Sequence, residues 1–141
     1  MATQQNRLLS SLGLPDDVLN NQAKFIHFVR EGISGEVVKH AVKLLGNRDL
    51  IVRILGTTSS NLSRYYRVRR MNQVDSEEML DTLRLYAQAL DVFGDIDKVS
   101  EWMRTPLPVF SGESPESLLD TFEGREWVSQ VLRKITYGEF V

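Results

Sequence analysis

Apolar residues recur along most of the chain at helical spacing, three or four positions apart. Two stripes show this most clearly: Val37, Val38, Ala41, Leu44 and Leu45, and then Leu80, Leu83, Ala87 and Leu90. Such spacing places the apolar side chains on one face of an α-helix. The sequence contains no run of alternating β-branched residues between hairpin turns. The pattern therefore predicts an all-α fold.

Glycines and capping residues divide this pattern into short helices. A glycine just past the last apolar position is typical of a helix end, and Ser, Asn or Asp just before the first is typical of a start. These signals predict helices over residues 18–30, 34–45, 47–55, 60–68 and 75–93, and a shorter one from residue 95 that contains Trp102. Residues 1–17 are expected to form a mobile arm or a short helix.

Two further signals concern the longest helix and the last two. Asp75 and Glu78 have the spacing of a capping box, which places the start of the long helix at Asp75. Ser114 followed by Pro115 is a strong start signal for a helix near the end of the chain. We expect Gly124 to break that helix, so that a final helix runs from about residue 125 to 137.

The helices at 47–55 and 60–68 are joined by a tight turn that contains Gly56, which is the pattern of a helix-turn-helix. Leu50, Ile54 and Leu62 are expected to pack between these two helices. In the DNA-binding version of this motif, the second helix enters the major groove and its first residues contact base edges. The motif alone does not establish that this chain binds DNA.

The charges strengthen that interpretation. Residues 1–74 carry 11 Lys and Arg against 5 Asp and Glu, whereas residues 75–141 carry 6 against 14. A basic half attracts nucleic acid and an acidic half suits a basic protein, so the split indicates two roles. The alternative is that the two halves simply neutralise each other.

Arginines cluster at the end of the predicted second helix, where Tyr65 and Tyr66 lie among them. Arginine forks pair with phosphates and guanine edges, and tyrosine hydroxyls reach phosphates. The predicted DNA-binding residues are Ser59, Ser60, Asn61, Ser63, Arg64, Arg67, Arg69 and Arg70. The alternative is a solvated basic face with no ligand.

The sequence offers little for catalysis. It has no cysteine, which excludes disulfides and thiolate chemistry, and its two histidines lie on predicted helices. We therefore expect no catalytic residue, metal site or cofactor, and a protein that is not an enzyme. No apolar run approaches the roughly 20 residues that span a bilayer, and the first residues do not resemble a secretion signal. A cytoplasmic protein with no membrane contact is expected.

The end of the chain stays apolar and aromatic, from Tyr137 through Phe140 to Val141. Chain ends are usually polar and poorly ordered. Three residues beyond a helix end bury themselves poorly without help. This terminus therefore predicts a partner surface, on another protein or a second copy.

The same region resembles a known family. The residues that carry the resemblance are Trp102-Met103-Arg104-Thr105-Pro106, Gly112, Ser114-Pro115, Leu118-Leu119, Gly124 and Tyr137-Gly138-x-Phe140. Their spacing resembles the Xre/MbcA/ParS toxin-binding domain, and upstream residues such as Gly32, Leu45-Gly46 and Leu62-Ser63-Arg64 fit the same family. The resemblance covers about residues 30–141.

The resemblance implies an antitoxin of a type II toxin–antitoxin pair. Its expected partner is a RES-domain toxin that consumes NAD⁺, with the antitoxin's C-terminal segment near the toxin's active site. Family members also bind their own promoter as dimers, so a homodimer and promoter DNA are expected. Carried over by position, the toxin-binding residues are Trp127, Val128, Val131, Leu132, Ile135, Tyr137, Glu139, Phe140 and Val141.

Residues 1–73 are thus predicted to form an arm and a helix-turn-helix-like DNA-binding bundle, and residues 74–141 a small helical toxin-binding domain. Asp81 departs from the family, which usually has Arg there. Two alternatives stay open. One is a stand-alone helix-turn-helix transcriptional regulator with a C-terminal dimerisation domain. The other is an antitoxin whose degenerate helix-turn-helix binds no DNA.

Overall fold

The computed structural model describes residues 3–138, and this part of the chain is helical without a strand, which confirms the all-α prediction. The α-helices are α1 (Gln4–Leu12), α2 (Gln22–Glu31), α3 (Gly35–Leu45), α4 (Arg48–Leu55), α5 (Leu62–Tyr65), α6 (Gln73–Phe93), α7 (Ile96–Arg104) and α8 (Phe122–Thr136). Two 3-10 helices, η1 (Pro108–Phe110) and η2 (Pro115–Leu118), lie between α7 and α8.

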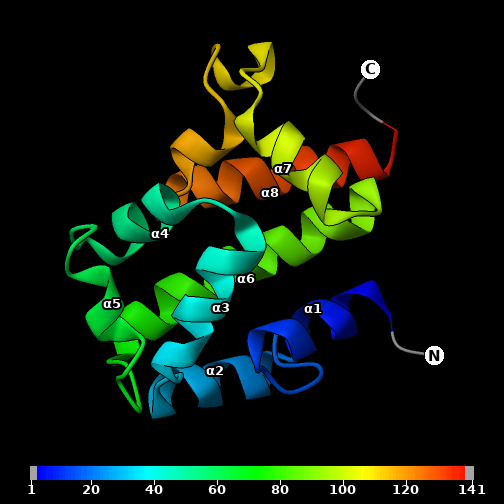
Figure 1. Cartoon of the computed structure of the whole chain (residues 1–141). Helices are drawn as coiled ribbons and strands as arrows, with labels where there is room; N and C mark the ends of the chain where they lie inside the picture. The colour runs from blue at the N-terminus through cyan, green and yellow to red at the C-terminus, as the bar shows by residue number, and fades with distance from the viewer. Residues whose placement is uncertain (1–2, 139–141) are drawn as a thin grey trace.

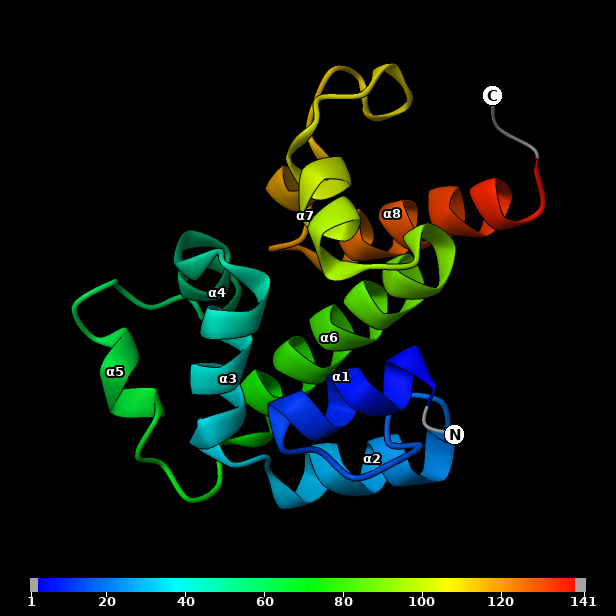
Figure 2. The same cartoon turned by 45° about the vertical axis from the view of Figure 1, so that its right-hand side comes forward.

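Helix α6 is the centre of the fold. It packs against α1, α2 and α4 from the first half of the chain and against α7 and α8 from the second (Figures 1 and 2). Because α6 serves both groups of helices, the buried apolar residues form one continuous cluster. The predicted boundary between residues 73 and 74 coincides with the start of this shared helix, and the division into two domains stays a prediction.

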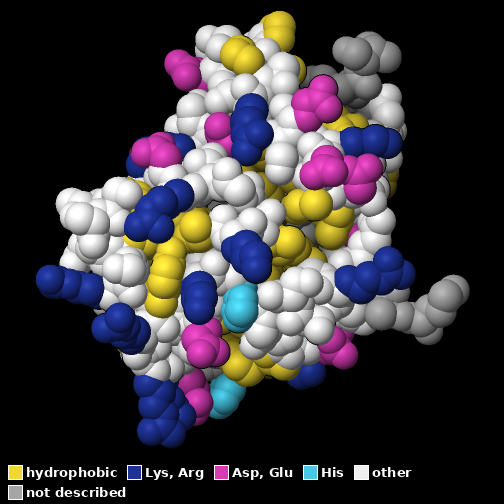
Figure 3. All heavy atoms as spheres, viewed as in Figure 1, with side chains coloured by type: hydrophobic (Ala, Val, Ile, Leu, Met, Phe, Trp, Pro, Cys, Tyr) yellow, Lys and Arg dark blue, Asp and Glu magenta, His cyan; other side chains and the backbone are white. Residues whose placement is uncertain are grey.

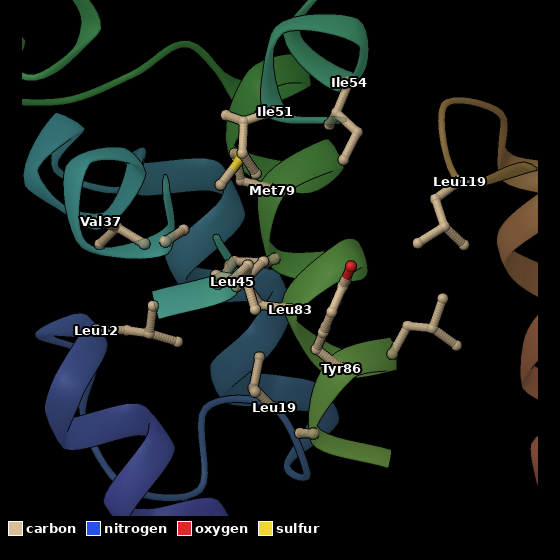
Figure 4. Packing of buried hydrophobic residues seen from close by; sticks show 14 of the residues in the cluster. Leu12, Leu19, Val37, Leu45, Ile51, Ile54, Met79, Leu83, Tyr86 and Leu119 are labelled. Atoms are coloured by element: carbon tan, nitrogen blue, oxygen red, sulfur yellow. The ribbon is translucent and has the colours of Figure 1, made fainter. Parts of the chain in front are cut away.

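The core joins side chains from distant parts of the sequence. Leu12 of α1, Ile51 of α4 and Leu83 of α6 are all buried in it, and Leu119 reaches it from the segment before α8 (Figure 4). Tyr86 of α6 is 2% exposed, and this burial raises the pKa of its hydroxyl well above the usual value near 10. The phenol is therefore neutral and packs as part of the core.

The first residues are part of the body. Leu8, Leu9 and Leu12 of α1 are buried, and α1 packs against α3 and α6. At its start, the Gln4 side chain donates a hydrogen bond to the carbonyl of Gly94, and Gln5 Nε2 donates to Asp91 Oδ2 over 2.5 Å. Of the two expectations for this segment, the short helix is confirmed and the mobile arm is wrong.

Side-chain caps explain several helix boundaries, and two of them differ from the prediction. Helix α2 begins at Gln22 rather than residue 18, because Asn21 caps it by accepting a hydrogen bond from the Lys24 amide. Helix α6 begins before Asp75, because Asn72 accepts from the Asp75 amide over 2.8 Å. Asparagine caps a helix as well as aspartate, and its oxygen takes one of the otherwise unpaired first amides.

The two halves of the chain meet at α4 and η2. Arg53 donates to the carbonyl of Glu116 over 3.1 Å and forms an ion pair with Asp120 at 3.5 Å. Asn47 Nδ2 donates to the Glu116 carboxylate over 2.7 Å. These contacts bring basic and acidic halves together locally, but they do not involve the arginine cluster that follows α5. Charge neutralisation between the basic and acidic halves of the chain therefore does not account for the arginine cluster.

No helix within residues 3–138 has the length and apolar character needed to cross a bilayer.

Candidate partner-binding surfaces

The exposed face of α8 carries two aromatic side chains. Trp127 is 37% exposed and Tyr137, directly after the helix, is 76% exposed. Gln130 and Lys134 lie between them at helical spacing and are also exposed. With a rise of about 1.5 Å per residue, the two aromatic positions lie about 15 Å apart along the helix axis. This face offers a partner two large anchors separated by polar side chains.

Other predicted toxin-binding residues lie on the buried side of α8. Val128, Val131 and Leu132 are 0–5% exposed and belong to the core of the chain itself. Burial removes these three from direct contact with a partner unless α8 separates from α6, so in this structure they hold the helix in place. Ile135 is half-buried. The remaining residues of the prediction, Glu139, Phe140 and Val141, lie outside the described residues.

Sequence reasoning missed part of this surface. Phe122, the first residue of α8, is 65% exposed, and Gln130 and Lys134 share the outer face with Trp127. The spacing 127, 130, 134 and 137 is visible in the sequence and marks one helix face. The apolar positions of α8 do not reveal this outer face, because they form the stripe that is buried in the core.

Gly124 lies inside α8 and does not break the helix, so the predicted break is wrong. A Cβ atom at this position would lie 1.7 Å from the carbonyl oxygen of Leu118, at the end of η2. Only glycine allows the helix to approach the preceding backbone this closely. The predicted helix from Ser114 is correspondingly reduced to the 3-10 turn η2, and α8 begins at Phe122 with Thr121 as its cap.

Arg125 fastens α8 to α6. Its guanidinium is 4% exposed and pairs with Glu78 at 2.9 Å and with Asp81 at 2.7 Å, both on α6. It also donates to the carbonyl of Leu119 over 2.9 Å. A buried arginine requires such partners, since an unpaired buried charge is strongly unfavourable. Asp81 therefore serves as a partner for Arg125.

A polar groove of about 310 Å³ lies between α6 and α8. Its lining includes the paired side chains of Asp81 and Arg125. Gln88 and Ser129 bridge it, since Ser129 Oγ donates to Gln88 Oε1 over 2.8 Å and Gln88 Nε2 donates to the Ser129 carbonyl over 3.0 Å. These groups satisfy one another, so the groove mainly holds the two helices together.

Four aromatic rings connect the end of α6 to the exposed face of α8. The ring centroids of Phe93 and Trp102 are 5.3 Å apart, those of Trp102 and Phe110 are 6.2 Å apart, and those of Phe110 and Trp127 are 5.1 Å apart. The last two contacts are edge-to-face, a favourable geometry for aromatic pairs. Trp127 is thus exposed on one side and held on the other.

The predicted helix-turn-helix region lies at the other end of the molecule. Leu50, Ile54 and Leu62 are buried, as expected for residues between its two helices. Helix α5, however, covers only Leu62–Tyr65, and its continuation to Val68 consists of 3-10-type turns. The predicted helix over residues 60–68 is therefore too long.

Local hydrogen bonds explain the short helix. The Asn61 amide donates to Thr58 Oγ1 over 3.2 Å, and Asn61 Nδ2 donates to Thr57 Oγ1 over 3.1 Å. Such side-chain contacts compete with helical hydrogen bonds, so the chain before Leu62 forms a turn. At the far end, the Val68 carbonyl accepts from the Gly35 amide over 2.8 Å, which directs the backbone toward α3.

Arg48, at the start of α4, holds this turn. Its Nε donates to Ser59 Oγ over 3.0 Å, one Nη donates to the Ser59 carbonyl over 2.5 Å, and the other lies 3.3 Å from the Tyr66 hydroxyl. Sequence reasoning did not single out this arginine. Its contacts fix the start of the region where base contacts are predicted.

The predicted DNA-binding side chains lie on the surface. Seven of them, Ser59, Ser60, Ser63, Arg64, Arg67, Arg69 and Arg70, are exposed, and Asn61 is half-buried. Arg70 lies 3.7 Å from Glu31. Lys and Arg side chains gather over α5, α4 and α3 on the face shown in Figure 3. Whether these residues contact DNA stays a prediction.

Within residues 3–138, no group of three or more His, Cys, Asp or Glu side chains is arranged to hold a metal ion. His27 lies 3.7 Å from Glu31 on the exposed side of α2.

The fold and these surfaces define an all-α protein with an aromatic helix face at one end and a basic helical turn at the other. Residues 88–138 match the family described as the antitoxin Xre/MbcA/ParS C-terminal toxin-binding domain. The match includes the end of α6, the loop after α7 and all of α8.

Curated relatives extend the likeness. A protein named "Antitoxin Xre" from Yersinia enterocolitica is 28% identical over 143 residues, which covers 99% of this chain and 94% of the relative. A "Prs ADP-ribosylating antitoxin" from a Sphingobium species is 39% identical over 75 residues, so the match covers about half of each chain (47%). An "Antitoxin Xre" from Photorhabdus laumondii is 31% identical over 62% of this chain and 61% of its own.

Residues 88–138 therefore resemble the toxin-binding domain of the Xre/MbcA/ParS-type antitoxins, and the chain as a whole is similar to antitoxins of toxin–antitoxin systems.

Proposed function

We propose that this antitoxin neutralises a RES-domain toxin that consumes NAD⁺, by binding it directly through α8 and the residues that follow it. The observation that carries the proposal is the exposed face of α8, which lies within the part of the chain that matches the toxin-binding domain. Trp127 and Tyr137 are of the residue types that contribute most to protein interfaces.

The proposed inhibition is steric. A cleft that binds an anionic dinucleotide is basic, so a segment that carries the acidic residue Glu139 has complementary charge. Phe140 and Tyr137 would supply aromatic rings at the same place. The outer face of α8 would provide the docking contacts that bring this segment to the toxin's active site.

The docking contacts can be tested with Trp127→Ala. We expect affinity for a cognate RES-domain toxin to fall about 30-fold, the equivalent of about 2 kcal/mol for an aromatic interface anchor. Val74→Ala is the matched control, since Val74 is 69% exposed and lies at the far end of α6, and it should bind within about twofold of wild type.

Affinity is measured by isothermal titration with catalytically inactive toxin, at a temperature where circular dichroism shows both variants folded. If Trp127→Ala binds as wild type does, α8 is not the docking face. If wild type binds no such toxin and leaves cellular NAD⁺ unprotected, the proposed function is wrong.

A second proposed activity is autoregulation, in which a homodimer binds its own promoter DNA. It is supported by the exposed arginines in and directly after α5, because Arg64, Arg67 and Arg69 have no ion-pair partner among residues 3–138. Arg48 supports it further, since it fixes the turn where base contacts would begin. The short α5 is the observation that favours the alternative in which the motif binds no DNA.

Salt dependence separates these alternatives. If Arg64 and Arg67 contact phosphates, the double variant Arg64→Ala/Arg67→Ala should bind promoter DNA more weakly. The slope of log K against log salt should also flatten by about 0.9 for each phosphate that the variant no longer neutralises. Lys98→Ala, an exposed cation on α7, should change neither quantity. Unchanged DNA binding in the double variant excludes these residues, and no binding by wild type excludes autoregulation.

The stand-alone transcriptional regulator remains the competing function. It predicts DNA binding and dimerisation without any toxin partner. Co-purification with the product of the adjacent gene distinguishes the two, since a plain regulator would retain no RES-domain protein.

A further inference from the structure

The loop between α7 and α8 projects from the body of the protein. It comprises residues 105–114 and contains η1. In both views it projects from the top of the molecule, above α7 and α8 (Figures 1 and 2). The loop is therefore open to a partner that approaches α7 and α8 from that end of the molecule.

The loop is held in shape by its own backbone. The Leu107 amide donates to the Glu113 carbonyl over 3.1 Å, which closes the two ends of the loop. The amides of Phe110 and Gly112 both donate to the Leu107 carbonyl over 3.0 Å. Because the loop is already ordered, its binding to a partner costs little further conformational entropy.

Phe110 joins the loop to the exposed face of α8. Its side chain is 0% exposed and meets Trp127 edge-to-face, with 5.1 Å between the ring centroids. The same ring also meets Trp102, with 6.2 Å between the ring centroids. The base of the loop and the Trp127 anchor are consequently in direct contact and form one continuous surface.

The outer part of the loop is apolar. Pro106 and Pro108 are exposed, Leu107 and Val109 are half-buried, and Glu113 is the one charged residue from 105 to 114. The loop carries no positive charge that would attract phosphates, which argues against nucleic acid. A rigid apolar projection beside an aromatic anchor fits an apolar depression on a protein.

We propose that loop 105–114 is a second contact arm for the toxin that docks on α8, with Pro108 and Val109 seated on an apolar patch of that toxin. The inference rests on the proposed function. The loop and the end of α8 contact two separate regions of the toxin. The shape of the loop helps determine which toxin binds.

The test places a charge on the loop. Val109→Asp and Pro108→Glu should each weaken binding of catalytically inactive RES-domain toxin at least tenfold, because a carboxylate would be buried against an apolar surface. Pro108 is exposed and begins a helical turn, where an acidic residue is tolerated, so its replacement should leave the fold intact. Val74→Asp is the matched control and should bind within twofold of wild type.

The outcomes distinguish this inference from the proposed function. If both loop variants bind like wild type while Trp127→Ala binds weakly, the loop inference is overturned and the docking face on α8 stands. If wild type binds no toxin, both are overturned. Analytical ultracentrifugation of the antitoxin alone gives a further check: a wild-type dimer that the loop variants convert to a monomer would show that the loop seats a second copy instead.

Discussion

A chain that ends at Thr136 is expected to lose all protection against the toxin while keeping its fold. The shortened protein lacks Tyr137 and the four residues after it, which under our proposal block the active site. Tyr137 is 76% exposed, whereas Val128 and Leu132, which hold α8 on α6, are retained. Cells that express toxin with this variant should lose NAD⁺ as fast as cells with toxin alone.

We expect this variant to keep binding the toxin although it no longer protects cellular NAD⁺. The outer face of α8 remains, so the shortened chain should still co-purify with toxin, at reduced affinity. Tyr137→Ala is the milder companion, and we expect it to protect partially. Full protection by the chain that ends at Thr136 would contradict the steric mechanism and would place inhibition in the docking contacts themselves.

Gly124→Ala should unfold the C-terminal part of the protein or cost about 3 kcal/mol or more of unfolding free energy. Alanine normally stabilises a helix interior by about 1 kcal/mol relative to glycine. Here the sign reverses, because the added Cβ would lie 1.7 Å from the Leu118 carbonyl oxygen and 2.9 Å from Thr121 Oγ1. Relief requires α8 to shift away from η2, which disturbs the contacts of Arg125.

Urea unfolding followed by circular dichroism measures this destabilisation. Gln130→Ala, at an exposed position of the same helix, is the control and should change the unfolding free energy by less than about 0.5 kcal/mol. A Gly124→Ala protein as stable as wild type would show that η2 moves freely and that the close approach is not required.

The fold class was predictable because helical spacing and caps act locally. Ser34, Asn47 and Asp95 cap helices in the structure, and a glycine follows α3, α4 and α6. Two helix starts were misplaced because local caps at Asn21 and Asn72 were overlooked, whereas the predicted break at Gly124 was wrong because packing between elements decides there. Gly124 has the local character of a helix breaker, yet its backbone is helical and its lack of a side chain serves a tertiary contact.

The site was predictable to a different degree. The resemblance identified α8 and its end, but residue spacing could not separate its inner face from its outer face until α6 was placed. Val131 and Trp127 are both large and apolar, and only the packed structure shows that one is 5% and the other 37% exposed. The loop and Arg48 were missed because their roles depend on contacts with Trp127 and Ser59.

The length of α6 has a consequence for how the protein is removed from a cell. Its 21 residues extend about 32 Å and belong to the packing of both halves. Opening either end exposes apolar surface on the helix that supports the other. We therefore expect cleavage at one end to destabilise the other, so that no stable fragment with only one of the two surfaces persists. The amounts of the α8 face and of the basic turn in the cell therefore change together, because both depend on the amount of intact protein.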